Sequence, residues 1–568
     1  MKKRKLLLLI IPFILSSCGG GEQPPFDDDK DDDDSTIIGG DDGGMFDDDD
    51  EDDAFIPTLK DDTNSNYVFE DVDNKGGATY EIFVRSFYDS DGDGIGDLNG
   101  VTQKLDYLKD LGVENIWLMP FNESPSYHGY DVEDYYSIEK DYGTLDDFKK
   151  LNEKAESLGI NIYMDLVINH SSSTNAWFEQ SAMDYYTNNT SANSKKDWYC
   201  WSDTGGSNRH EYKGMGFYYE GDFSSSMPDF NLDCEAVRNE LANVIKYWLD
   251  LGVDGFRLDA VLYYYQSNVS KNIEFLNWIK DTAESVKKDT YIVGEAWVSN
   301  QSGINEYYRS KVDSFFNFPS SLNGSGNDSI NSVVKGFTNA NLFGSSMESK
   351  EKSQKENNPK GRSSYFLANH DMDRSSQNLT GDLAKAASSL MILLPGNPYM
   401  YYGEEIELKG KRTSNSTDAE RRLPMIWSKD DKTGECDVPD RASLGSNYKP
   451  DQVELGVDDQ LKNGYSLVNH YKKAINLRNK YNFIQDAIFE NLTVSIASQD
   501  DHVLLYKLTN GDDSIIVCHN FNDSARQVEI GDISTEILDS INTTKKIPEL
   551  NAGKLSLGGY STVILNVK

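Results

Sequence analysis

The feature that most constrains the fold is an alternation of short apolar segments with amphipathic stretches, which begins near Gly77. Apolar segments of strand length that alternate with helical patterns are typical of repeated βα units and a parallel sheet. Eight strand candidates occur, at residues 79–87, 114–119, 161–167, 254–259, 291–296, 313–318, 363–369 and 398–403. Eight such units predict an α/β fold, a closed (β/α)8 TIM barrel.

Two further domains are predicted beside the barrel. Residues 171–227, between the third and fourth strand candidates, are rich in Trp, Tyr, Asn and Ser and show no helical periodicity. We interpret them as a small inserted domain B, which leaves residues 76–170 and 228–478 to the barrel. From residue 479 to 568, short apolar runs such as LTVSIAS and HVLLYKL alternate with Gly, Asn and Asp turns. This pattern predicts a C-terminal antiparallel β-sandwich.

The first 18 residues have the form of a secretory signal: a basic start, a short apolar run and a small-residue site. The run is too short to span a bilayer comfortably. It ends in LSSC, which resembles the bacterial lipobox, so we expect Cys18 to be lipidated. An ordinary signal peptide with a chance cysteine is the alternative. The protein is therefore expected to be exported, lipid-anchored to the bacterial membrane and facing the cell exterior.

Residues 19–75 are rich in Asp and Gly and poor in apolar residues. Such a segment cannot bury enough surface to offset chain entropy, so we expect a disordered acidic tether. Between Glu22 and Asp53 there are 15 Asp and 2 Glu but only one lysine, Lys30. Binding of calcium or wall material by the acidic runs is the alternative. The formal net charge of -40 argues against nucleic acid as a partner.

The remaining cysteines are Cys200, Cys234, Cys436 and Cys518. They form no CxxC pair and show no metal-ligand spacing. Export would permit a disulfide, but the sequence does not indicate which cysteines would pair.

Four acidic segments lie at the ends of predicted strands and carry the chemistry. They are DLVINH with Asp165, GFRLDA with Asp259, GEAW with Glu295 and ANHD with Asp371. Carboxylates at the C-terminal ends of different parallel strands meet in one pocket. Hydrolysis of a glycosidic bond needs one carboxylate at the sugar carbon and one carboxylic acid at the leaving oxygen. The four segments therefore predict a glycosidase.

These segments, in this order and together with MPDFN at residues 227–231, resemble the α-amylase family, glycoside hydrolase family 13. The resemblance extends from about residue 77 to the end of the chain. It implies that Asp259 is the nucleophile, that Glu295 is the general acid and then base, and that Asp371 grips and distorts the sugar. It also implies a retaining mechanism. Asp165 and Asn169 would support the strand end without direct catalysis.

The same resemblance assigns substrate-binding roles to other residues. His170 and His370 resemble ligands of sugar hydroxyls, His128 lies in a third motif, and Tyr130 in YHGYD resembles an aromatic platform under the sugar. Arg257 would keep Asp259 ionised. The alternatives are structural histidines, a core tyrosine and a structural ion pair.

The loop DSDGDGIGD at residues 89–97 is a candidate metal site. Oxygen ligands are available on alternate residues, from the side chains of Asp89, Asp91, Asp93 and Asp97 and from the carbonyl of Ile95. A loop after the first strand binds Ca²⁺ in the family that the chain resembles, so we expect a structural Ca²⁺. An acidic turn without a metal is the alternative.

Departures from family patterns bear on specificity. Leu262 and Tyr263 stand where many α-amylases have Lys-His, which puts a second calcium site in doubt. Exo-acting relatives close their pocket with an Asp before GYD and an Arg; here Tyr127 and His128 precede GYD, although Arg422 is present. We therefore expect a monomeric endo-hydrolase of α-1,4 bonds in starch, glycogen or maltodextrins. The alternatives are a neopullulanase or cyclomaltodextrin hydrolase, an α-glucosidase or transglycosylase, and a non-catalytic surface glucan-binding protein.

Overall fold

The computed structural model describes residues 76–266, 268–322, 324, 326–414, 417–439, 444, 452–496 and 500–568. The predicted signal peptide, Cys18 and the acidic tether at residues 19–75 lie outside the described residues. Within the described ranges, no helix combines the length and the apolar character that a membrane crossing requires.

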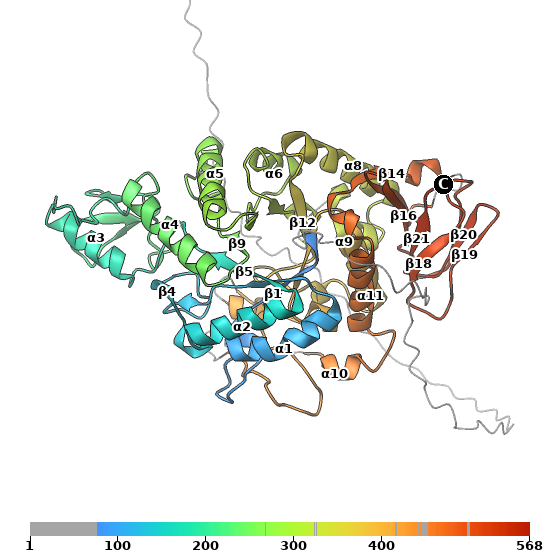
Figure 1. Ribbon diagram of the computed structural model, residues 1–568, viewed down its shortest axis with the longest axis horizontal. Helices are drawn as coiled ribbons and strands as arrows, with labels where there is room; N and C mark the ends of the chain where they lie inside the picture. The colour runs from blue at the N-terminus through green and yellow to red at the C-terminus, as the bar shows by residue number, and fades with distance from the viewer. Residues whose placement is uncertain are drawn as a thin grey trace, which may run out of the picture. The chain divides into compact units, whose positions relative to one another are not determined.

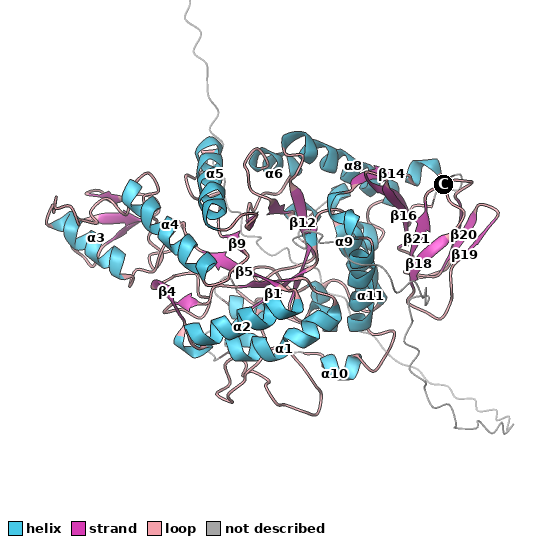
Figure 2. Cartoon of the chain, in the orientation of Figure 1, coloured by secondary structure: helices cyan, strands magenta, loops and turns pink. Residues whose placement is uncertain are grey.

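The centre of the chain is a closed barrel of eight parallel strands, in the order β1-β13-β12-β11-β10-β9-β5-β2 (Figures 1 and 2). All eight observed strands fall on the predicted segments to within one residue at their starts, which confirms the barrel. The strands are β1 Thr79–Ile82, β2 Asn115–Leu118, β5 Asn161–Leu166, β9 Gly255–Leu258, β10 Tyr291–Gly294, β11 Ser314–Phe316, β12 Arg362–Phe366 and β13 Asn397–Tyr401.

Amphipathic helices connect the barrel strands and pack their apolar faces on them. Local sequence sets their ends: Thr144 caps α2 through a capping box, and Gly112 and Gly159 end α1 and α2 in the left-handed conformation. The helices are α1 Leu98–Leu111, α2 Leu145–Leu158, α4 Glu235–Asp250, α5 Val269–Val286, α6 Gln301–Tyr307, α7 Ile330–Val334, α8 Ala340–Asn357, α9 Asp382–Leu393, α10 Val457–Gln460 and α11 Leu467–Lys480.

The insertion after β5 contains a helix that the sequence analysis did not predict. Helix α3, Ala176–Tyr186, begins at Asn175, whose side chain accepts a hydrogen bond from the Trp177 amide. The helix packs beside a small sheet of order β6-β8-β7, formed by Trp201–Ser202, Tyr218–Glu220 and Arg209–Glu211. Several aromatic side chains of the insertion are buried as its core: Phe178, Trp198, Tyr199, Phe217 and Tyr219. Two short strands, β3 Asn122–Glu123 and β4 Asp134–Ile138, pair before the insertion.

The C-terminal region forms two antiparallel sheets, of orders β14-β15-β16-β21-β18 and β17-β20-β19. Apolar residues of both sheets share one core, for example Leu505 and Val563 with Val528 and Leu557. The strands are β14 Ile488–Asn491, β15 Val503–Asn510, β16 Asp513–Asn520, β17 Arg526–Glu529, β18 Ile537–Ile541, β19 Glu549–Asn551, β20 Lys554–Leu557 and β21 Thr562–Asn566. The prediction of a strand in the LTVSIAS segment is wrong for Thr493–Ser495, which forms a single 3-10 turn.

None of the four described cysteines, Cys200, Cys234, Cys436 and Cys518, takes part in a disulfide. Burial raises the pKa of the Cys518 thiol and, to about 12, that of Cys200. At neutral pH both groups therefore remain thiols.

Candidate active site

The barrel brings the predicted acids together at the carboxyl ends of its strands. Asp259 directly follows β9, and Glu295 directly follows β10. Asp371 lies five residues beyond the end of β12. All three line one cavity of about 850 Å³, a volume within the usual range of roughly 300 to 1,000 Å³ for ligand pockets.

Arg257, on β9, links three of the carboxylates. Its side chain is 1% exposed, and Nη1 lies 2.7 Å from Oδ1 of Asp259 and 2.9 Å from Oδ1 of Asp165. Nη2 lies 2.8 Å from Oε1 of Glu295. One guanidinium therefore fixes the two predicted catalytic acids relative to each other. Asp165, which accepts from Nη1 through both oxygens, in turn orients the arginine and lines no part of the cavity.

Glu295 is placed so that its protonated form persists at neutral pH. Burial, together with the neighbouring charges of Asp259 and Asp371, raises its pKa to about 7 against the opposing effect of Arg257. Its Oε2 accepts a hydrogen bond from the Ala260 amide at 3.3 Å. Ala260 has a φ of 53°, a left-handed conformation that a non-glycine residue adopts at an energetic cost and that is common at functional sites.

Asp371 is held between two cations. Its Oδ2 lies 2.9 Å from Nε2 of His370, and its Oδ1 lies 3.0 Å from Nη2 of Arg422. Burial would raise its pKa, but His370 and then Arg422 outweigh burial and hold the pKa well below the usual range. Arg421 also donates to the Asp371 carbonyl at 2.6 Å. The third acid is thus ionised and fixed in one orientation.

His370 is fully buried and bonded on both ring nitrogens. Nδ1 lies 2.6 Å from Oε1 of Glu81, and Nε2 also lies 2.8 Å from the Tyr130 hydroxyl. Burial alone would lower its pKa, but Asp371 and Glu81 raise it to about 9. His370 is therefore a cation at neutral pH and donates to both carboxylates. The Tyr130 ring stacks on it, with ring centroids 5.5 Å apart at an angle of 15°.

His128 and His170 present free ring nitrogens to the cavity. The Nδ1 of His128 accepts the Tyr130 amide at 3.0 Å, so its proton is assigned to Nε2. The Nε2 of His170 is buried without a protein partner, while its Nδ1 lies 3.3 Å from the Asn169 amide nitrogen. Burial lowers the pKa of both histidines, so both are neutral at pH 7 and suited to bond a sugar hydroxyl.

Asn169 and MPDFN meet behind His170. The Asn169 side chain donates to Oδ1 of Asp229 at 3.1 Å, and the Asp222 amide donates to Oδ2 at 2.9 Å. Burial raises the pKa of Asp229 to about 7. Asp229 thus connects Asp222 of the insertion with Asn169, which precedes His170 just after the end of β5. Asn169 therefore supports His170 and has no direct place in the cavity.

The structure adds residues at and behind the cavity to which the motifs assign no role. Glu81 on β1 has no motif of its own but orients His370. Phe223, Tyr263 and Trp297 are 45%, 43% and 45% exposed and line the cavity, so their ring faces are available to a ligand. Tyr263 has a signal in the sequence as a departure from the family pattern, and Trp297 ends the GEAW segment.

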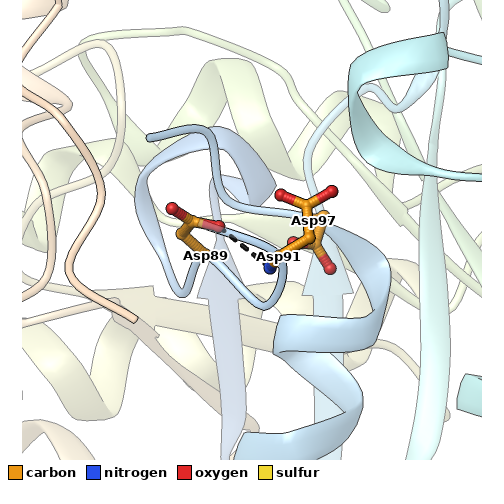
Figure 3. Close-up of side chains that lie close together, drawn as sticks. All are labelled: Asp89, Asp91 and Asp97. Carbon is orange, nitrogen blue, oxygen red and sulfur yellow. Dashed lines mark hydrogen bonds between the residues drawn. The ribbon is translucent and has the colours of Figure 1, made fainter. Parts of the chain in front are cut away.

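The acidic loop lies between β1 and α1 in the chain, and none of its residues 89–97 lines the cavity. Figure 3 shows Asp89, Asp91 and Asp97 of this loop close together. Asp89, Asp91 and Asp97 can each place one carboxylate oxygen within 4.8 Å of the others. Asp89 accepts three backbone N–H groups, and Asp97 caps α1 through the Gly100 amide. Asp93 lies outside this group, and its carboxylate accepts the Ile95 amide at 2.8 Å.

The model of the α-amylase catalytic domain matches residues 81–487, and that of the SusG α-amylase C-terminal domain matches residues 503–564. The chain belongs to the α-amylase family, glycoside hydrolase family 13. It is a glycoside hydrolase.

Individual members of the family differ in their named activities. The chain is 38% identical to alpha-amylase 3 of Dictyoglomus thermophilum, over 87% of this chain and 93% of that one. It is 31% identical to an oligo-1,6-glucosidase of Parageobacillus thermoglucosidasius, over 79% and 90%. The solved structure of Eubacterium rectale Amy13B aligns with a TM-score of 0.80 and 36% identity, over 86% of this chain and 95% of that one.

Proposed function

We propose that the protein is an α-amylase: a retaining hydrolase that cleaves internal α-1,4-glucosidic bonds of starch, glycogen or maltodextrins. The observation that carries the proposal is the pairing of two carboxyl groups across Arg257. Asp259 lies 2.7 Å from one guanidinium nitrogen, and Glu295, with a pKa raised by burial to about 7, lies 2.8 Å from the other. A nucleophile and an acid of this kind are the requirements of glycoside hydrolysis.

The reaction would proceed in two steps. Glu295 protonates the glycosidic oxygen while a carboxylate oxygen of Asp259 attacks the anomeric carbon, so the leaving sugar departs as an alcohol. Glu295, now ionised, then takes a proton from water, which displaces Asp259 and restores the acid. Asp371, held ionised by His370 and Arg422, would accept hydroxyl hydrogen bonds and stabilise the positive charge that develops on the sugar ring.

Endo action is supported by the surroundings of Arg422. Its guanidinium bonds Asp371 and the His370 carbonyl, while the hydroxyl of Tyr127, in the place of the closing aspartate of exo-acting relatives, donates to the Arg422 carbonyl at 3.4 Å. No acidic side chain before GYD is therefore available to close the cavity over a terminal glucose. The exposed rings of Phe223, Tyr263 and Trp297 line the cavity and offer surface on which a longer chain can pack.

A time course on soluble starch tests this specificity. Internal cleavage should abolish iodine staining before much reducing sugar accumulates. Early release of glucose with little loss of staining would contradict endo action and favour an α-glucosidase. Faster hydrolysis of pullulan or β-cyclodextrin than of starch would favour a neopullulanase or a cyclomaltodextrin hydrolase instead.

The pKa of Glu295 sets an expected pH dependence. The general acid must carry a proton, so kcat/KM should fall as pH rises through about 7, by a factor of about ten per pH unit above it. The measurement is a pH profile on maltoheptaose. A matched profile on α-maltosyl fluoride, whose leaving group needs no proton, should lose this alkaline limb. A profile on maltoheptaose that stays flat to pH 9 would contradict the role of Glu295.

We also propose that the loop at residues 89–97 binds Ca²⁺. The fit is supported by unused acceptor capacity: Asp89 and Asp97 each retain a lone pair beyond their backbone bonds, and Asp91 retains more. A bound cation would neutralise three carboxylates that otherwise repel one another. The loop also contacts a segment distant in the chain, since the backbone amide of Asp437 donates to the Gly94 carbonyl at 2.8 Å.

Removal of calcium should therefore lower thermal stability. We expect a chelator to lower the Tm by several degrees, because a ligand that binds only the folded state stabilises it. Asp91→Asn should abolish the response to Ca²⁺ without uncapping α1, and Asp106→Asn, an exposed carboxylate on α1, is the control. An unchanged Tm after chelation of the unaltered protein would refute the site.

For the N-terminus we propose lipidation of Cys18 and export to the cell exterior. The proposal is supported by the basic start, the apolar run and the LSSC sequence. Metabolic labelling with a fatty acid should mark the protein and not its Cys18→Ala variant.

A further inference from the structure

A pocket of about 480 Å³ lies between helices α6 and α8, which pack against each other (Figure 1). One wall is a face of α6, from Gln301 to Arg309 just beyond the helix, and the other is a face of α8, from Ser346 to Asn357. Asp328, at the end of the 3-10 turn Gly326–Asp328, completes the wall. No described residue lines both this α6–α8 pocket and the catalytic cavity.

Each described side chain that lines the α6–α8 pocket is polar. The facing sides of packed helices are normally apolar, so a polar face on both helices leaves a hydrophilic hollow where a core would be expected. Hydroxyl and amide groups both donate and accept hydrogen bonds, as the hydroxyl groups of a ligand require. Three of the lining side chains are carboxamides and four are serines: Ser302, Ser346, Ser349 and Ser353.

The charged side chains of the pocket balance one another. Arg309 and Lys350 are cationic, and Glu306 and Asp328 are anionic. Because the charges cancel, the pocket favours neither an anion nor a cation. Among the described lining residues there is no aromatic ring on which the face of a sugar could stack. The lining therefore fits a small neutral molecule that is bound through its hydroxyl groups.

Lys350 provides a buried donor that the protein leaves largely unused. Its side chain is 6% exposed, and Nζ lies 3.0 Å from Oδ2 of Asp328. The other oxygen of Asp328 accepts the Ser346 hydroxyl, which fixes the carboxylate. Within the part of the chain that the structure describes, Nζ has no further partner. An ammonium has three hydrogens to donate, and buried donors left unbonded are costly, so ligand oxygens in the pocket would satisfy them.

Hydrogen bonds hold the α6 side of the pocket in place. The Gln301 side-chain amide donates to Oδ1 of Asn305 at 2.9 Å, and Asn305 donates to the Ser353 hydroxyl oxygen at 2.8 Å. Asn317, which directly follows β11, donates to Oε1 of Gln301 at 3.1 Å. Since Ser353 accepts in this chain, its own proton remains for a ligand. The pocket is thus preorganised, which lowers the entropy that binding costs.

We infer that the α6–α8 pocket is a binding site for a neutral mono- or disaccharide, separate from the catalytic cavity. Its volume of about 480 Å³ lies within the usual range of roughly 300 to 1,000 Å³ for ligand pockets. Lys350 and Arg309 donate to sugar oxygens, and Asp328 and Glu306 accept from sugar hydroxyls. The inference goes beyond the proposed function, because it holds for any bond specificity of the hydrolase.

Amide hydrogen exchange of the full-length Glu295→Gln protein tests the site, with maltose as the probe. This variant allows maltose to bind without being cleaved. Maltose should slow exchange at residues 301–309 and 346–357 by at least about threefold at saturation, because a ligand that binds the folded state suppresses local opening. Protection at the cavity, for example at residues 369–374, is measured in the same experiment and reports a separate binding event.

Two variants and one control identify the pocket as the source of the protection. Ser349→Leu places a large apolar side chain in the pocket and should abolish protection of both segments. Ser285→Leu, the same change at an exposed serine of α5, should leave it intact. Asp328→Asn combined with Lys350→Met removes both charges and leaves neither unpaired, so it should weaken maltose binding by about tenfold or more. This pair of substitutions decides the question if the leucine variant does not fold.

Absence of protection at the two segments, or protection that persists in both variants, would overturn the sugar site. Equal slowing of exchange in all helices would also overturn it, since that is the effect of a sugar excluded from the protein surface. These outcomes leave the proposed function intact, because hydrolysis of starch tests that function independently.

Discussion

Replacement of Glu295 by glutamine should lower kcat on starch by about 10³-fold or more. Glutamine keeps the shape of the side chain but supplies no transferable proton, and general acid catalysis contributes up to about 10⁴-fold. Glucan affinity should remain within a few-fold, because the bonds of Asp371, His370 and Arg422 do not involve Glu295. Initial rates and equilibrium binding of maltoheptaose measure the two effects separately.

Glu404→Gln is the matched control for this change. Glu404 is also buried, its pKa is raised by burial to about 8, and it accepts a hydrogen bond from Tyr471 at 2.6 Å, but it does not line the cavity. Its substitution should leave kcat within about twofold. A Glu295→Gln enzyme that retained a tenth or more of the original kcat would remove Glu295 from the mechanism.

Replacement of Arg257 by leucine should affect both stability and activity. The change leaves Asp165, Asp259 and Glu295 buried without their shared cation, and breaking a buried ion pair in this way costs about 3–5 kcal/mol. We expect the free energy of unfolding to fall by this order and kcat to fall by at least about 10²-fold. Denaturant unfolding and initial rates are the measurements.

Arg257→Lys separates charge from geometry. Lysine restores a positive charge near Asp165 but lacks the planar guanidinium, whose Nη1 bonds Asp259 and whose Nη2 bonds Glu295. Stability should recover in part and kcat should stay low. If the leucine variant were as stable and as active as the unaltered protein, the guanidinium would not be the link that the account requires.

The sequence predicts the barrel well because its signals are local. Each strand is a short apolar run; Asp259 and Glu295 directly follow such runs, Asp165 lies one residue before the end of β5, and Asp371 lies in the segment after β12. The topology of a parallel barrel then brings the strand ends together without further information. The insertion lacks such local signals. Its helix α3 begins at one capping residue, Asn175, and the sequence predicts an irregular segment there.

What the sequence does not predict depends on contacts between distant segments. Glu81 and His370 are 289 positions apart, and the role of Glu81 follows only from their 2.6 Å contact. The sequence identifies Arg422 only as the remaining half of a closing pair whose aspartate is absent, whereas its guanidinium bonds the carboxylate of Asp371. Phe223 and Tyr263 come from different domains and meet only in the folded protein.

Histidine protonation likewise depends on the folded surroundings. His370 and His170 occupy equivalent places in the ANHD and INHS segments, but burial leaves His170 neutral while Glu81 and Asp371 keep His370 charged. Part of the difference is local, since Asp371 follows His370 directly whereas Ser171 follows His170; the other part is Glu81 on β1, which no local pattern encodes.

Covalent trapping tests the division of roles between Asp259 and Glu295 most directly. The Glu295→Gln protein is treated with α-maltosyl fluoride, whose fluoride departs without a proton, so attack on the sugar can occur while hydrolysis of the product is slowed. The account predicts a mass increase of one maltosyl unit on the peptide that contains Asp259, and none in the additional Asp259→Asn variant. A label on another residue, or full turnover with no label and an inverted product, would contradict it.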